Sequence, residues 1–243
     1  MIPKIIHYCW FGGGQKPESV ERNISQWKQI LFDYVFVEWN ENNFDVNYNR
    51  YVQEAYKNKK YAFVSDVCRL YALKQQGGVY LDTDVEVLKR FDSFLMQHSF
   101  IGEEQNGLLL GTAVIGALRE SVWVQDFLKS YENIRFEITK TKFNDKPNTI
   151  RITDFLKKYD GEKPRTYPVD FFCAKDYKTK KVLVTDNTVC IHHYAESWVV
   201  TPRYKRIESI FWNVFGLKNL NILGKLYWKI LVPIKKIFQK EDE

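Results

Sequence analysis

The chain has 243 residues, 45% of them hydrophobic and 16% aromatic, which is enough for one large domain with its own core. The formal net charge is +6, and residues 216–243, with six lysines and three acidic residues, supply three of those charges. The rest of the chain is only mildly basic, so the composition argues against a nucleic-acid-binding protein.

The four cysteines form no C-x-x-C pair, which argues against a disulfide framework or a zinc site and favours buried thiols in a reducing compartment. The N-terminal segment MIPKIIHYCWFGGG lacks the pattern of a signal peptide, and no run of apolar residues is long enough to cross a bilayer. We therefore expect a cytoplasmic protein, with peripheral association at the inner face of the plasma membrane as an option.

Strand-like and helix-like segments alternate through the first half of the chain. The expected strands are residues 2–11, 34–39, 79–81, 85–88, 99–104 and 107–117, with a strand-rich segment at 165–194. The expected helices are residues 17–31, 50–59, 61–76, 119–133, 148–159, 203–215 and 217–240. This alternation predicts an α/β domain with a mixed, mostly parallel central sheet over residues 1–215.

Residues 216–243 are expected to form a basic amphipathic extension. On a helical wheel most of their lysines gather on one face, and the large apolar residues lie roughly opposite. This pattern favours a helix that lies in the plane of an anionic membrane, although a helix packed on its own domain would look similar. Pro233 is expected to kink or restart the helix.

The stretch GGVYLDTDVE, residues 77–86, places Asp82 and Asp84 directly after a short buried strand. On an extended strand the two carboxylates would point to opposite faces, but on a turn they can converge. Convergent carboxylates suit Mg²⁺ or Mn²⁺, which is usually shared with substrate phosphates. Taken alone, the pair also fits an ordinary solvated turn.

A second feature precedes this motif. Asp66 and Arg69 share one face of the expected helix 61–76. The pair is either a plain helix salt bridge, or a carboxylate for sugar hydroxyls with a guanidinium near a sugar or phosphate.

Together these residues resemble the signature of DXD-motif sugar-binding glycosyltransferases, glycosyltransferase family 32, which is related to initiating α-mannosyltransferases and bacterial capsular polysaccharide enzymes. The opening IPKIIHYCWFGGGQKP and the later IHHYAESW, residues 191–198, resemble further elements of that family. The matching signature residues are Ser65, Asp66, Arg69, Gly77, Gly78, Tyr80, Asp82 and Asp84.

The resemblance implies a GT-A-type nucleotide-binding sandwich, a nucleotide-sugar donor, a divalent metal and retention of anomeric configuration. Asp66 and Arg69 would bind the donor sugar. Asp82 would contact the ribose, or the metal through water, and Asp84 would bind the metal directly. A histidine would complete the coordination, with His193 favoured over His192, and imidazole favours Mn²⁺ over Mg²⁺.

Other family positions would hold the nucleotide. Trp10 would stack on the base, Tyr80 would support the sugar or ribose, and Ser197 and Trp198 would hold the diphosphate. The carboxylates and amides of residues 103–106 follow a strand and are candidates to approach the sugar. No nucleophile is singled out among them, and same-face attack guided by the leaving phosphate is preferred to a covalent route.

We therefore expect a retaining transferase that moves a hexose or N-acetylhexosamine from a nucleotide-diphosphate sugar, with UDP favoured, to a saccharide acceptor. A lipid-linked acceptor in surface polysaccharide synthesis would suit the basic extension. Two alternatives remain open. One is a sugar nucleotidyltransferase or pyrophosphorylase, with Lys16 in GGGQKP as a phosphate-binding residue, and the other is a non-catalytic sugar- or lipid-binding protein.

Overall fold

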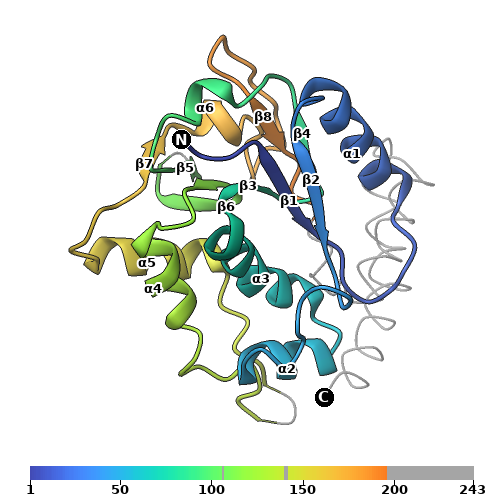
Figure 1. The fold of residues 1–243 in the computed structure, drawn as a ribbon, viewed down its shortest axis with the longest axis vertical. Coiled ribbons are helices and arrows are strands. Elements are labelled where there is room, and N and C mark those ends of the chain that lie inside the picture. The colour runs from blue at the N-terminus through green and yellow to red at the C-terminus, as the bar shows by residue number, and fades with distance from the viewer. Residues whose placement is uncertain (106, 140–141, 196–243) are drawn as a thin grey trace, which may run out of the picture. The chain divides into compact units, whose positions relative to one another are not determined.

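The computed structural model describes residues 1–105, 107–139 and 142–195, and residues Met1–Ala195 form one compact unit (Figure 1). The expected helices at 203–215 and 217–240, and the expected boundary between residues 215 and 216, lie outside the described residues. No helix within the described ranges is long and apolar enough to cross a bilayer.

A six-stranded sheet forms the centre of this unit, in the order β2-β1-β3-β6-β5-β7. Only β6 runs antiparallel to its neighbours in this sheet, and every other pair is parallel. The predicted α/β class with a mixed, mostly parallel sheet is thereby confirmed. The strands are β1 (Ile5–Cys9), β2 (Val35–Trp39), β3 (Gly78–Leu81), β5 (Ser99–Glu104), β6 (Leu109–Ala117) and β7 (Arg165–Tyr167).

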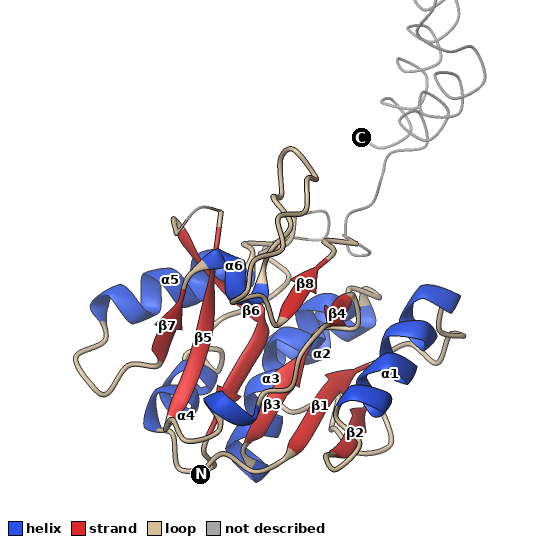
Figure 2. Cartoon of the chain, turned by 90° about the horizontal axis from the view of Figure 1, so that it is seen from above, coloured by secondary structure: helices blue, strands red, loops and turns tan. Residues whose placement is uncertain are grey.

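Helices cover both faces of the sheet, and each face has its own apolar core (Figures 1 and 2). On one face lie α2 (Arg50–Lys57), α3 (Tyr61–Gln76), α4 (Val122–Lys129) and α5 (Asn148–Lys158). On the other lie α1 (Glu18–Ile30), the short 3₁₀ helix η1 (Asp92–Phe94) and α6 (Val169–Phe172). Strand alternation divides β3 between them, since Tyr80 packs in the first core and its neighbours Val79 and Leu81 pack in the second.

A second, two-stranded sheet joins distant parts of the chain. Strand β4 (Val85–Val87) pairs antiparallel with β8 (Cys190–His192), and Val85 lies opposite His192. The indole of Trp27 in α1 donates a 2.8 Å hydrogen bond to the carbonyl of Val85, which fixes β4 against the second core. This pairing brings the segment after β3 next to the end of the described chain.

Glycine is required where α3 turns into β3. Gly77 and Gly78 both have positive φ, at 65° and 110°. A Cβ on Gly78 would lie 2.7 Å from the carbonyl oxygen of Ile5 in β1. The two glycines therefore allow β3 to approach β1 closely at the point where β3 begins.

Two sequence expectations need correction. The helix expected over 119–133 is shorter, because residues 118–121 form a turn before α4 begins. The strand-rich segment expected at 165–194 contains only short strands, together with α6 and a hairpin closed by the pairing of Lys175 with Val182. Pro168, which cannot donate to a strand ladder, ends β7 and precedes α6.

Candidate active site

The acidic motif lies in a tight turn between β3 and β4. Asp82 N–H donates to the carbonyl of Ala113, and Val85 N–H donates to the carbonyl of Asp82. The turn lies beyond the carboxyl end of β3, where open α/β sheets bind ligands. Since the backbone is no longer extended, Asp82 and Asp84 converge, as the sequence predicted.

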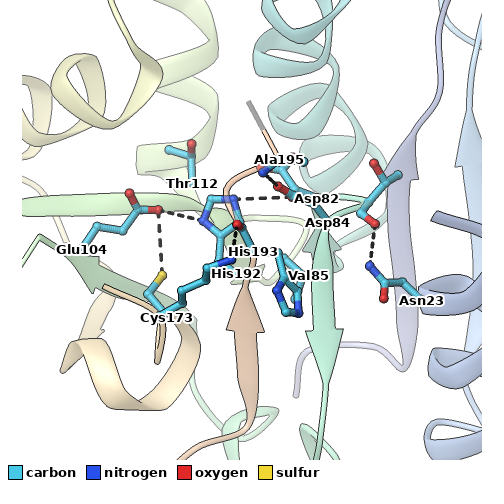
Figure 3. Close-up of polar contacts among 12 residues, drawn as sticks. Asn23, Asp82, Asp84, Val85, Glu104, Thr112, Cys173, His192, His193 and Ala195 are labelled. Atoms are coloured by element: carbon cyan, nitrogen blue, oxygen red, sulfur yellow. Dashed lines mark hydrogen bonds and ion pairs between the residues drawn. The ribbon is translucent and has the colours of Figure 1, made fainter. Parts of the chain in front are cut away.

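His192 completes a three-residue group with these carboxylates. One ligand atom from each of Asp82, Asp84 and His192 lies within 4.8 Å of the other two (Figure 3). His192 Nε2 lies 3.4 Å from Asp84 Oδ1, and the backbone N–H of Ala195 donates to Asp84 Oδ2 at 2.8 Å. Two carboxylates and one imidazole are a suitable donor set for Mn²⁺.

The ring of His193 contacts Glu86 and is not part of this three-residue group. Its ring nitrogen Nε2 lies 2.8 Å from Glu86 Oε2, and its backbone N–H donates to the carbonyl of Asp84. Consecutive residues at the end of a strand face opposite sides. The geometry therefore reverses the preference for His193 and makes His192 the candidate metal ligand.

The charges of the site are set by burial and by close partners. Burial alone would raise the pKa of Asp84, but the contacts from His192 and the Ala195 N–H outweigh it and lower the pKa to about 2. Burial alone would lower the pKa of His192, but Asp84, Cys173 and Glu104 outweigh it and raise that pKa well above its usual range. Without a metal, these contacts favour the protonated form of His192 beside the ionised Asp84.

Two buried side chains, those of Tyr80 and Arg69, hold the Asp82 carboxylate in place. The hydroxyl of Tyr80 donates to Asp82 Oδ1 at 2.8 Å, and Arg69 Nη2 lies 3.3 Å from the same oxygen. The Arg69 guanidinium also lies over the Tyr80 ring, 4.6 Å from its centroid. Asp82 thus has a fixed orientation toward Asp84 and His192.

Arg69 itself is almost fully committed to protein partners. It lies 2.9 Å from Asp66 Oδ1, donates to the carbonyl of Thr112 and, through Nε, to the carbonyl of Ser65. Only 5% of its side chain is exposed. Through these contacts and its ion pair with Asp82, Arg69 links α3, β6 and the acidic turn.

Asp66 is also buried, beside Arg69. Burial raises the pKa of Asp66 to about 6, against the opposing effect of the Arg69 charge. The predicted contact of Asp66 with a donor sugar stays a prediction.

Trp10 follows β1, which runs parallel to β3, so its ring lies at the same edge of the sheet as the acidic turn. The ring is half-buried, and its Nε1 donates to the carbonyl of Gly14 at 2.7 Å. Base stacking on Trp10 stays a prediction. Ser197 and Trp198 lie outside the described residues.

The sequence did not identify the environment of His192. Glu104, the last residue of β5, is buried, and its Oε1 lies 3.5 Å from His192 Nδ1 and 3.8 Å from the sulfur of Cys173 (Figure 3). Gly111 makes room for this carboxylate, since a Cβ there would lie 2.8 Å from Glu104 Oε1. The available signal was a carboxylate at a buried position of the strand SFIGEE.

Comparison with known proteins connects the site to a class. Residues 17–101 match the family model described as "Glycosyltransferase sugar-binding region containing DXD motif". This segment contains Asp66, Arg69, Asp82 and Asp84, and the resemblance to DXD sugar-binding glycosyltransferases is confirmed for it.

Individual relatives are distant or partial. Glucan organizing enzyme 1 of Cryptococcus neoformans var. grubii serotype A is 35% identical over 85 residues, which cover 30% of this chain and 23% of that protein. The chain thus matches less than a quarter of the length of this curated relative.

Two solved structures are similar over larger parts of the chain. The PaToxG glycosyltransferase is 17% identical, with a TM-score of 0.45, over 64% of this chain and 68% of that one. A glycosyltransferase involved in the glycosylation of the major capsid of PBCV-1 is 12% identical, with a TM-score of 0.49, over 85% of this chain and 98% of that one.

Proposed function

We propose that the protein is a metal-dependent glycosyltransferase that moves a hexose or N-acetylhexosamine from a nucleotide-diphosphate sugar to a saccharide acceptor. The observation that carries this proposal is the convergence of Asp82, Asp84 and His192 beyond the carboxyl end of β3. The first two residues lie within the segment that matches the DXD sugar-binding region.

The described residues fit a divalent cation. Asp84 and His192 would hold it directly, and Asp82 would hold it directly or through water. Bound there, the cation would stabilise the negative charge that develops on the leaving diphosphate. The imidazole in the donor set favours Mn²⁺.

Hydrogen bonds and ion pairs within the protein already orient the two carboxylates of this site in the absence of a ligand. Arg69 and Tyr80 fix Asp82, and the Ala195 N–H fixes one oxygen of Asp84. Glu104 faces His192 Nδ1, which makes no hydrogen bond within the described residues. With a proton retained on Nδ1 and directed at Glu104, Nε2 would keep its lone pair for the metal.

The finer assignments rest on the resemblance. We propose a GT-A-type enzyme of family 32 that retains anomeric configuration, uses a UDP-sugar, stacks the base on Trp10 and holds the diphosphate with Ser197 and Trp198. Glu104 is buried against His192 and Cys173, so it is poorly placed to be a nucleophile. This removes one of the candidate carboxylates among residues 103–106, and we keep same-face attack as the proposed route.

The acceptor and the membrane are further parts of the proposal. A lipid-linked saccharide in surface polysaccharide synthesis would suit a protein whose residues 217–240 associate with the inner face of an anionic plasma membrane. Vesicle flotation of the chain with and without residues 217–243 tests this, and equal flotation would remove the role of the extension.

Hydrolysis of nucleotide sugars tests the central proposal, because slow hydrolysis needs no acceptor. UDP-hexoses, UDP-N-acetylhexosamines and GDP-mannose are screened with and without Mn²⁺. We expect Mn²⁺-dependent release of a nucleoside diphosphate, and a loss of about 100-fold or more in Asp84→Asn. Asp154→Asn, at an exposed carboxylate paired with Lys146, is the matched control. An Asp84→Asn variant as active as the wild type at limiting Mn²⁺ would refute the metal site.

The same screen separates the alternatives. A nucleotidyltransferase would leave the nucleotide sugars intact in this screen. It would release inorganic diphosphate when a nucleoside triphosphate and a sugar 1-phosphate are supplied instead. Its candidate phosphate-binding residue, Lys16, is ion-paired with Glu38 at 2.9 Å. A non-catalytic binding protein would bind the nucleotide sugar without turnover.

A further inference from the structure

A projecting hairpin, residues 174–184, lies beside the candidate active site and has no part in the proposed chemistry. Its ladder includes hydrogen bonds from Asp176 N–H to the carbonyl of Lys181 and from Leu183 N–H to the carbonyl of Ala174, each 2.8 Å long. The Asp176 carboxylate caps the turn by accepting from the backbone N–H groups of Lys178 and Thr179. These hydrogen bonds therefore give the hairpin and its turn a defined conformation.

Apolar side chains project from this hairpin into solvent. Val182, Leu183 and Val184 are 46%, 73% and 55% exposed. On the extended arm of an antiparallel hairpin consecutive side chains alternate in direction, so Val182 and Val184 share one face and Leu183 lies on the other. Both faces of this arm therefore expose aliphatic side chains.

Exposed lysines precede these aliphatic residues in the hairpin. Lys178, Lys180 and Lys181 are all exposed, and residues 177–184 contain no acidic residue. Asp176, which precedes this stretch, is engaged in capping the turn, and Asp186, which follows it, is exposed. Exposed aliphatic side chains next to exposed lysines match the interface of an anionic bilayer, where the former enter the acyl boundary and the latter meet the headgroups.

Direct contacts connect the hairpin to the site. Lys175 Nζ donates to the carbonyl of His193 at 3.0 Å. The Tyr177 ring lies 5.3 Å from that of Tyr194, whose ring lies 4.1 Å from that of His192. A surface bound by the hairpin would lie next to the metal-binding histidine.

We propose that residues 174–184 are a membrane-docking hairpin that binds the surface of an anionic phospholipid bilayer. Docking itself is independent of the proposed transfer reaction. Only the expected benefit of docking, which is to bring a lipid-linked acceptor to the site, rests on the proposed function. A single-stranded nucleic acid would use the lysines but give no reason for the exposed aliphatic side chains.

Vesicle co-sedimentation of the full chain tests the hairpin. Vesicles of phosphatidylcholine with about a third phosphatidylglycerol are compared with pure phosphatidylcholine, in EDTA and without nucleotide sugar, so the result is independent of catalysis. We expect Leu183→Asp to weaken binding about tenfold or more, and the combined change of Lys178, Lys180 and Lys181 to Gln to weaken it by on the order of 100-fold.

Matched controls come from the opposite end of the sheet and from other surfaces. Met96→Asp alters an equally exposed apolar side chain before β5, and Gln substitutions at Lys28, Lys57 and Lys129 remove the same charge from exposed sites elsewhere. We expect these controls to bind like the wild type. Hairpin variants that bind as tightly as the controls, or a wild type that does not bind anionic vesicles, would overturn the proposal.

A fluorescence measurement keeps the test independent of any folding defect. The four native cysteines are buried, so a Leu183→Cys variant can be labelled selectively with an environment-sensitive fluorophore. Anionic vesicles should shift its emission to the blue, whereas the label on Met96→Cys should not respond. No shift at position 183 would also refute insertion.

Discussion

Arg69, which is buried, and Asp82, which is half-buried, form an ion pair between α3 and the acidic turn, with Nη2 3.3 Å from Oδ1. The same guanidinium nitrogen lies 2.9 Å from Asp66, so one cation compensates two carboxylates. A residue that the sequence assigned to the donor sugar therefore also supports the fold.

Replacing this cation should destabilise the protein strongly. Arg69→Met keeps most of the side-chain volume but leaves two carboxylates without a buried partner, so we expect a loss of about 3–5 kcal/mol in the free energy of unfolding. Urea denaturation measures it, with Arg165→Met at an exposed position of β7 as the control. Adding Asp66→Asn should recover part of the loss, and strictly additive effects would contradict the coupling.

The two adjacent histidines should differ in metal binding. His192→Ala should weaken Mn²⁺ binding by at least about 100-fold, because it removes one of three ligands, whereas His193→Ala should change it less than about threefold. Electron paramagnetic resonance of free Mn²⁺ gives both affinities. The reverse ranking would restore His193 as the ligand.

Metal binding should tighten with rising pH. The pKa of His192 is raised above its usual range, so below that pKa Mn²⁺ must displace a proton from Nε2. The pKa of Asp84 is about 2, so this carboxylate stays ionised and adds no dependence near neutrality. We expect the affinity to rise about tenfold per pH unit from about pH 6 to 7, and His192→Ala to remove the slope. An affinity that is flat over this range would show that His192 is already neutral.

Glu104 should act as a positioning residue for His192. Glu104→Gln keeps the size of the side chain but removes its charge, and we expect Mn²⁺ binding to weaken by about 10-fold. The matched control is Glu103→Gln, at the half-buried neighbouring position of β5. Thermal unfolding in EDTA separates this effect from a loss of stability. Unchanged affinity in Glu104→Gln, with Asp84→Asn still defective, would reject the positioning role and leave the metal site intact.

Much of the domain was predictable because its patterns are local. Helical spacing identified α1 and α3, and Gly77 and Gly78 marked the end of α3. The turn after a buried strand correctly predicted that Asp82 and Asp84 converge. Each of these inferences depends only on residues that lie within a few positions of one another in the sequence.

Which of the two histidines is the candidate metal ligand depends on the register of a long-range pairing. A slip of one residue between β4 and β8 would exchange the faces of His192 and His193, and nothing local in IHHYAESW sets that register. The role of Glu104 likewise depends on β5, β6 and β8 meeting in space. The sequence offered the salt bridge between Arg69 and Asp66 as one alternative, but it could not show that the carbonyl of Thr112 in β6 also accepts from Arg69. The contact of Arg69 with a donor sugar stays a prediction.

The β4–β8 ladder has only three residue pairs, yet it joins the acidic turn to the far end of the described chain. An ion shared by Asp84 and His192 would act as a cross-link between these strands, so its binding free energy would add to the stability of their pairing. Amide hydrogen exchange in β8 should then slow as Mn²⁺ is added, and quicken when it is removed. The availability of metal would thus set how firmly the last strand is held to the domain, as well as the rate of the reaction.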